Sequence, residues 1–184
     1  MTLIKSGVVN EDSTTELLYG VLVYKDRSDK DGDQMGHGQR HRGSVRRLTK
    51  LVVRVDGPRR HMQIQLPVVC SQTHAPEPDG SILRGVDDDY NHRMPQASDC
   101  VCVIEIADSS ILRDKHEKLP AYAGAGIPQY VIINTSDEEV EVYSSPDRTS
   151  RSYGSLSVFK KGESFSLLVE DEVTIDVAVD ELLI

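Results

Sequence analysis

The chain lacks several features that would assign it to a large class of proteins. No apolar stretch in its 184 residues approaches the roughly 20 needed to span a bilayer, and residues 1–10 lack the long apolar h-region of a secretory signal. No serine–histidine pairing, phosphate-binding glycine loop or dinucleotide signature is present. The three cysteines, Cys70, Cys100 and Cys102, form no even disulfide framework. We therefore expect a reduced cytoplasmic protein that does not enter the membrane.

The composition fits one globular domain over residues 1–184. Hydrophobic residues make up 38% of the chain and charged residues 28%, which is typical of a globular protein. A chain of this length buries a sizeable core without disulfides or a structural metal.

The net charge of −9 argues against binding to nucleic acid, but the charge is unevenly distributed. The window from Arg40 to Arg60 contains eight basic residues and one acid, Asp56. This window could follow a phosphate backbone, or it could be a solvated helix face that pairs with acids elsewhere. The candidate DNA contacts are Arg40, His41, Arg46 and Arg47.

The hydrophobic periodicity predicts one mixed sheet flanked by helices. Apolar residues recur at helical spacing between 45 and 55, which predicts a helix over about residues 39–55. Residues 100–106 are almost all apolar and predict a central strand covered on both faces. Further strands are expected at 62–66, 81–84, 129–134, 140–143 and 156–159, with 86–98 as a loop and 174–184 closing the fold. The order indicates an α/β (α+β) protein with a mixed central sheet and extra antiparallel strands.

The sequence predicts the local structure of two further segments in more detail. Residues 16–24 predict a short helix end, a turn at Gly20 and an edge strand, and residues 27–38 predict a mobile loop. Asp114 and Glu117 have the spacing of a capping box, which places a helix start at Asp114.

Pro120 leaves two possibilities for this second helix. Either the helix kinks, or it begins near Glu117 and places Pro120 in its first turn. Gly124 and Gly126 are expected to end it.

Two carboxylates and a lysine form the most informative chemical pattern in the chain. Asp79 follows Pro78, Glu105 ends the apolar central strand, and Lys118 lies in the following helix. A carboxylate at the end of a buried strand is costly unless it is paired or binds a metal. Carboxylates that hold a cation, with a lysine near the attacking water, meet the needs of a magnesium-dependent phosphodiesterase.

The motifs occur in a characteristic order over most of the chain. They are Glu16-Leu17-Leu18-Tyr19-Gly20, Gly38-Gln39-Arg40-His41, Glu77-Pro78-Asp79, Val103-Ile104-Glu105-Ile106, Asp114 to Lys118, and Tyr122 to Tyr130. In this order they resemble the Uma-two family of endonucleases, a branch of the restriction-endonuclease-like nucleases with a PD-(D/E)xK site. The likeness runs from Glu16 to about Tyr143.

The resemblance implies a metal-dependent DNA endonuclease that hydrolyses phosphodiester bonds. It implies Asp79 and Glu105 as metal ligands, joined by the carbonyl of Ile106. Lys118 would be the catalytic lysine, displaced from the strand position that Ala107 occupies, and Glu16 would add a further carboxylate. The expected cofactor is Mg²⁺, with Mn²⁺ as a substitute, and the expected partners are DNA and a second copy of the chain.

Three other interpretations remain open at this point. The chain could be a catalytically weak or inactive nuclease-like domain that serves in dimerisation or partner binding. His37 and His41 have the i, i+4 spacing of a helical zinc site, although a loop histidine and a capping histidine explain them more simply. Cys100 and Cys102 would share one face of a strand and could bind metal, but buried packing is the simpler interpretation.

Overall fold

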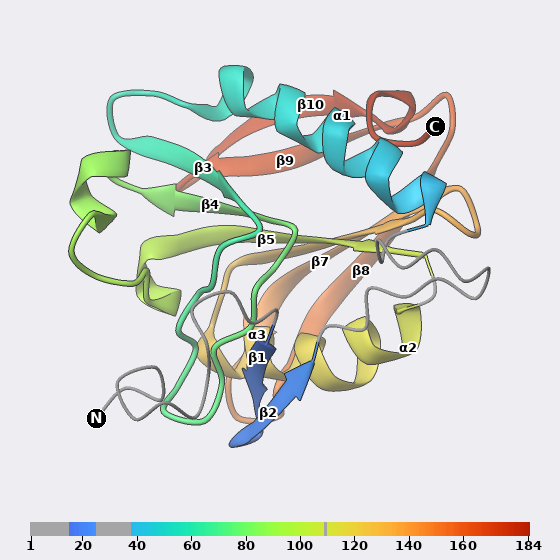
Figure 1. Cartoon of the computed structure of the whole chain (residues 1–184). Helices are drawn as coiled ribbons and strands as arrows, with labels where there is room; N and C mark the ends of the chain where they lie inside the picture. Colours follow the sequence, from blue (N-terminus) through green and yellow to red (C-terminus); the bar gives the residue numbers. More distant parts are fainter. Residues whose placement is uncertain (1–14, 25–37, 109) are drawn as a thin grey trace.

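The computed structural model describes residues 15–24, 38–108 and 110–184, and a six-stranded sheet runs through its centre (Figure 1). The strand order is β3-β4-β5-β6-β7-β8, and only β5 and β6 run parallel. The strands are β3 (Arg60–Ile64), β4 (Gly80–Arg84), β5 (Cys100–Ala107), β6 (Gln129–Asn134), β7 (Glu139–Asp147) and β8 (Ser152–Lys160).

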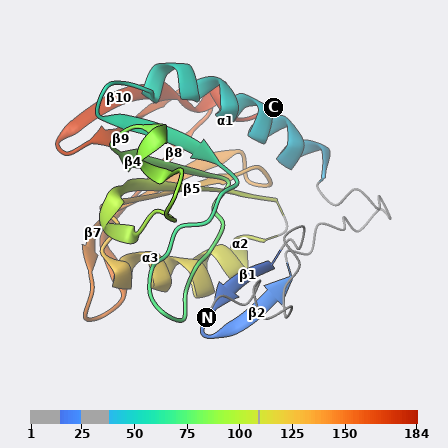
Figure 2. The same cartoon turned by 60° about the vertical axis from the view of Figure 1, so that its left-hand side comes forward.

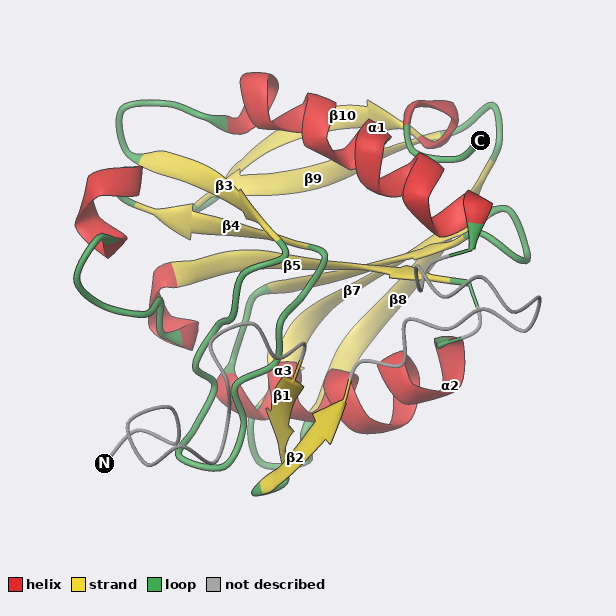
Figure 3. Ribbon diagram, viewed as in Figure 1, coloured by secondary structure: helices red, strands yellow, loops and turns green. Residues whose placement is uncertain are grey.

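Both faces of the sheet are covered, which gives the molecule its layers (Figure 3). Helix α1 (Gln39–Val55) and the hairpin of β9 (Ser164–Glu170) and β10 (Val173–Ala178) form a core with one face. The opposite face packs against a helical stretch that contains α2 (Ile111–Arg113) and α3 (Leu119–Ala125). Within the described ranges, no helix is long and apolar enough to cross a membrane.

Helix α1 confirms the prediction made from its periodicity. Its buried residues include Leu48, Leu51 and Val55, which lie three and four positions apart and so share one face. These side chains contact the first face of the sheet, so the arginines between them point elsewhere.

Strand β5 is buried along all eight of its residues, as expected for a central strand. The two cysteines on it do not share a face, contrary to the prediction. Ile82 pairs with Cys102 and Leu83 with Cys100, so Val101 forms a bulge in the ladder. Cys100 therefore packs on the α3 side and Cys102 on the α1 side.

Residues 15–24 form a hairpin, and the expected helix end at Glu16 is wrong. Strand β1 (Thr15–Leu18) pairs with β2 (Val21–Tyr24) around the turn at Tyr19 and Gly20. Glu16 and Leu18 are buried and alternate with more exposed neighbours, which is the period of a strand. The hairpin lies on the α3 side of the sheet, away from α1 (Figure 2).

The second helix is one continuous stretch from Ile111 to Ala125, so the capping box predicted at Asp114 is wrong. The backbone is α-helical to Arg113, widens into a π-helical turn over Asp114–Lys118, and returns to α-helix from Leu119. Pro120 has no N–H to donate to a preceding carbonyl, and a wider turn accommodates its ring. The stretch ends at Gly126 in the left-handed conformation, as predicted, whereas Gly124, which was also expected to end it, lies within α3.

The remaining predictions differ in outcome. The strands predicted around 81–84, 129–134, 140–143 and 156–159 are present, while β3 ends at Ile64 and does not reach Leu66. The predicted loop at 86–98 contains a 3-10 turn at Asp87–Tyr90 and adjoins a second at Ala97–Asp99. Strand β9 was not predicted. Most of the loop expected over 27–38, including His37, lies outside the described residues.

Candidate active site

A buried lysine and three carboxylates lie together where β1, β5 and the second helix meet. The Lys118 ammonium is 2.9 Å from Glu105 Oε1, 3.2 Å from Glu16 Oε1 and 3.8 Å from Asp114 Oδ1. All four side chains are 5% exposed or less. The structure therefore brings together three residues that were predicted from sequence, Glu16, Glu105 and Lys118, and adds Asp114.

The register of the sheet places Asp79 beside this group. Gly80 pairs with Ile104 across β4 and β5, so Asp79 lies next to Glu105 at the same end of the two strands. Asp79 Oδ2 accepts a hydrogen bond from the Ile106 N–H at 2.8 Å. The carboxylate is therefore tied to the residue that follows Glu105.

Burial and crowding of acids determine the electrostatics of the site. Desolvation by burial raises the pKa of Glu105 to about 8; the charge of Lys118 opposes this shift, and the nearby carboxylates add to it. Desolvation by burial also raises the pKa of Asp114. The surrounding carboxylates raise the pKa of Lys118 above its ordinary value, despite its burial. Lys118 therefore keeps its proton at neutral pH.

The Ile106 carbonyl, proposed from sequence as a metal ligand, lies beside His41. His41 Nδ1 is 3.0 Å from this carbonyl oxygen, and His41 Nε2 is 3.4 Å from Asp79 Oδ1. The histidine thus bridges β5 and Asp79 from the first turn of α1. His41 therefore lies at the carboxylate site, although it was predicted from the sequence to contact DNA.

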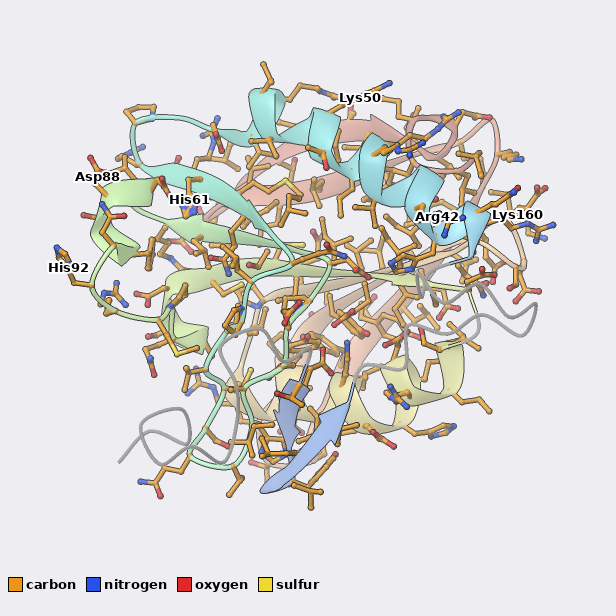
Figure 4. All side chains as sticks on the ribbon, in the orientation of Figure 1. Arg42, Lys50, His61, Asp88, His92 and Lys160 are labelled. Atoms are coloured by element: carbon orange, nitrogen blue, oxygen red, sulfur yellow. The ribbon has the colours of Figure 1, made fainter. Side chains whose placement is uncertain are left out.

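The other candidate DNA contacts have different surroundings. Arg40 and Arg46 are exposed on α1, and Arg40 Nη1 lies 3.5 Å from the Thr135 carbonyl. Arg47 donates to the Asp180 carbonyl at 2.6 Å, so its guanidinium is engaged by the C-terminal segment. Figure 4 shows Lys50 on the same helix pointing away from the sheet.

Two residues of the site were not predicted from the sequence. The Tyr122 hydroxyl donates to Glu105 Oε1 at 2.7 Å. Its spacing of four from Lys118 is a signal that both lie on one helix face. The Gln65 amide donates to Asp79 Oδ1 at 3.3 Å, and no pattern in the sequence identifies it.

A second ion pair, with a buried carboxylate and a partly exposed lysine, holds the same helical segment. Lys115 Nζ lies 2.7 Å from Glu141 Oε1, and the Tyr143 hydroxyl donates to the other oxygen of Glu141. Glu141 is buried although its neighbours Glu139 and Lys115 are more exposed. Lys115 and Lys118 thus fasten the π-helical turn to two strands of the sheet.

The donor atoms at the site fit a hard cation. Within the described ranges, no group of three or more His, Cys, Asp and Glu side chains is arranged to hold a metal ion. A site here would therefore use Asp79 and Glu105, with main-chain oxygen and water completing the shell, which is how Mg²⁺ binds to proteins. The carboxylates also outnumber the one lysine among them, so their ionised forms would favour a cation.

Comparison with known protein families matches residues 31–178 to Uma2, described as "Putative restriction endonuclease". The chain belongs to the Uma2 family. The resemblance inferred from the ordered sequence motifs is therefore confirmed. Among curated proteins, no relative matches this sequence.

A solved structure has the same fold as this Uma2 protein. It is the crystal structure of a "putative nuclease belonging to DUF820" from Anabaena variabilis ATCC 29413. It has a TM-score of 0.65 and 16% identity, over 99% of this chain and 97% of that chain. The predicted nuclease-like fold with a mixed central sheet is confirmed.

Proposed function

We propose that this Uma2 protein is a metal-dependent DNA endonuclease whose site is formed by Asp79, Glu105, Lys118 and Glu16. The observation that carries the proposal is the buried Lys118 ammonium 2.9 Å from Glu105, on a strand whose neighbour begins directly after Asp79. Buried groups with strongly shifted pKa values and a charged partner are typical of functional sites. Family membership supports the same activity.

Each side chain has a distinct role in this proposal. Asp79 and Glu105 are the metal ligands, together with the Ile106 carbonyl. Lys118 is a charged hydrogen-bond donor to the phosphate or to the attacking water, because its raised pKa keeps it protonated. Glu16 holds the ammonium at 3.2 Å from its own carboxylate. Bound Mg²⁺, or Mn²⁺ in its place, would neutralise charge that develops on the phosphate.

The decisive experiment titrates Mg²⁺ and Mn²⁺ calorimetrically into the wild type and Asp79→Ala, and follows plasmid nicking on the same samples. We expect Asp79→Ala to lose both metal binding and nicking while its circular dichroism is unchanged. Asp88→Ala is the control, because Asp88 is an exposed acid in a 3-10 turn away from the site (Figure 4). Nicking by Asp79→Ala would contradict the assignment.

The partners and location belong to the same proposal. DNA is the proposed substrate, a homodimer would supply two sites for the two strands, and the cytoplasm is the proposed compartment. Residues 1–184 are proposed to form one domain. Light scattering on the purified protein measures its mass in solution and tests the dimer directly.

One observation favours a second candidate, a nuclease-like domain that binds a partner without cleaving DNA. Three carboxylates already surround Lys118, at 2.9 to 3.8 Å, and such a satisfied network needs no metal to hold it. The calorimetric titration separates the two candidates. A wild type that neither binds metal nor nicks DNA supports the second.

A further inference from the structure

Gln65 has an unusual backbone at the edge of the candidate active site. It directly follows the last residue of β3, and its φ of +52° lies in the left-handed region. Its N–H donates to the Asp79 carbonyl at 3.2 Å, and its side-chain Nε2 donates to Asp79 Oδ1 at 3.3 Å. One residue therefore contacts both the main chain and the carboxylate of Asp79.

This conformation has an energetic cost that a glycine would avoid. A side chain with positive φ is crowded by the carbonyl that follows it, and glutamine is not among the residues that tolerate this region well. Glu138 and Glu172, which also have positive φ, lie in hairpin turns, and Ser145 lies at an irregularity within β7. Gln65 differs from Glu138 because its side chain reaches a site carboxylate, and strain of this kind concentrates at functional sites.

We propose that Gln65 is a positioning residue for the Asp79 carboxylate, held in a strained backbone so that its amide reaches Oδ1. The Ile106 N–H fixes the other oxygen, Oδ2, at 2.8 Å. The two donors are neutral, so they help to orient Asp79 without cancelling the negative charge that a cation requires. His41 Nε2 also lies near Oδ1, at 3.4 Å. The catalytic part of this inference rests on the proposed function.

The strain is tested by comparing two variants that both remove the amide. Gln65→Gly removes the side-chain amide and also relieves the strain of the positive φ. Gln65→Ala removes the amide but keeps that backbone strain. We expect the melting temperature of Gln65→Gly to exceed that of Gln65→Ala by about 2–4 °C. Equal melting temperatures would overturn the claim that the conformation is strained.

The positioning role is tested by nuclear magnetic resonance on the metal-free protein. The Ile106 amide proton reports the orientation of Asp79, because it is hydrogen-bonded to Oδ2. We expect this resonance to move upfield in Gln65→Met, which keeps the length of the side chain and loses the donor. Gln63→Met is the matched control, because the Gln63 amide donates to the carbonyls of Leu66 and Pro67. An unmoved Ile106 resonance in Gln65→Met would overturn the proposal.

Nicking kinetics complete the test. We expect Gln65→Met to lower kcat by about 10–100-fold with little change in KM for DNA, as for other residues that orient a metal ligand. A Gln65→Met enzyme with wild-type kcat would contradict the role in catalysis. If the wild type does not nick DNA but the Ile106 resonance still moves, positioning stands and the proposed nuclease function fails.

Discussion

Lys118 lies among three carboxylates that have little contact with water. Removing one partner from a buried ionic group leaves the others uncompensated, which costs about 3–5 kcal/mol. We expect Lys118→Met to lower the free energy of unfolding by about this amount in urea denaturation.

Lys161→Met is the matched control for Lys118→Met. Lys161 pairs with Glu138 at 3.0 Å, and both side chains are 40% exposed or more. Solvent screens such a pair, so we expect a change below about 1 kcal/mol. Equal losses in the two variants would mean that the carboxylates around Lys118 do not carry uncompensated charge.

Glu105 makes the stability of the metal-free protein depend on pH. Its pKa is about 8 in the folded protein and 4.5 ordinarily, so the folded state binds its proton more tightly than the unfolded state. The resulting stabilisation is complete below about pH 4.5 and is lost as the pH rises through about 8.

We therefore expect the melting temperature in chelating buffer to fall between about pH 5 and pH 8, and the fall to be smaller in Glu105→Gln. Asp114 acts in the same direction, since its pKa is also raised, so Glu105→Gln retains part of the effect. Thermal melts over this pH range measure both proteins. Parallel curves for the two proteins would assign the pH dependence to other groups.

The helix that carries Lys118 ends at a glycine with a specific conformational role. Gly126 has a φ of +78° at the C-cap of α3, whereas Gly124 lies within the helix. We expect Gly126→Ala to destabilise the protein by about 1 kcal/mol, because alanine is disfavoured in the left-handed region.

Gly124→Ala provides the comparison at nearly the same place. Alanine favours the helix by about 1 kcal/mol over glycine, although its Cβ would lie 3.1 Å from Arg151 Cγ. We expect Gly124→Ala to be more stable than Gly126→Ala in urea denaturation. The reverse order would show that space near Arg151 matters more than backbone conformation.

The elements predicted well from sequence are those whose burial follows a simple period. Helix α1 and strand β5 were found because one has a 3.6-residue apolar stripe and the other is buried on both faces. The errors lie where tertiary contacts override local signals. Asp114 has the spacing of a cap, yet its side chain is buried beside Lys118. The separation of Cys100 from Cys102 depends on a one-residue bulge, which periodicity does not reveal.

The candidate site was also predicted only in part from the sequence. Glu16, Asp79, Glu105 and Lys118 were selected from ordered motifs. The structure brings Glu16 and Glu105 to Lys118 and puts Asp79 beside Glu105, although their catalytic roles remain predictions. Gln65 could not be selected, because its contact with Asp79 depends on a positive φ that no residue pattern marks.

At the scale of the whole molecule, the uneven charge bears on how DNA would bind. The net charge is −9, so contacts with phosphate would be confined to basic surfaces such as the exposed part of α1. We expect the double variant Arg40→Gln/Arg46→Gln to weaken DNA binding and to reduce the slope of log K against log salt by about 1 for each lost phosphate contact.

Fluorescence anisotropy at several salt concentrations measures this slope. Arg93→Gln serves as the control, because the Arg93 guanidinium is already bound to Asp99. An unchanged slope in the double variant would place the DNA elsewhere on the surface.

The candidate site joins one of the most firmly held strands to a two-stranded hairpin. Strand β5 is buried throughout and pairs along both edges, whereas among the described residues β1 pairs with β2 on one edge and has a single bridge, from Leu17 to Ala75, on the other. Two-stranded ribbons open at lower free energy than central strands. In hydrogen-exchange experiments, the backbone amide of Glu16 should therefore exchange long before that of Glu105. On warming, Lys118 would lose one of its carboxylates by local opening, well below the temperature at which the sheet unfolds.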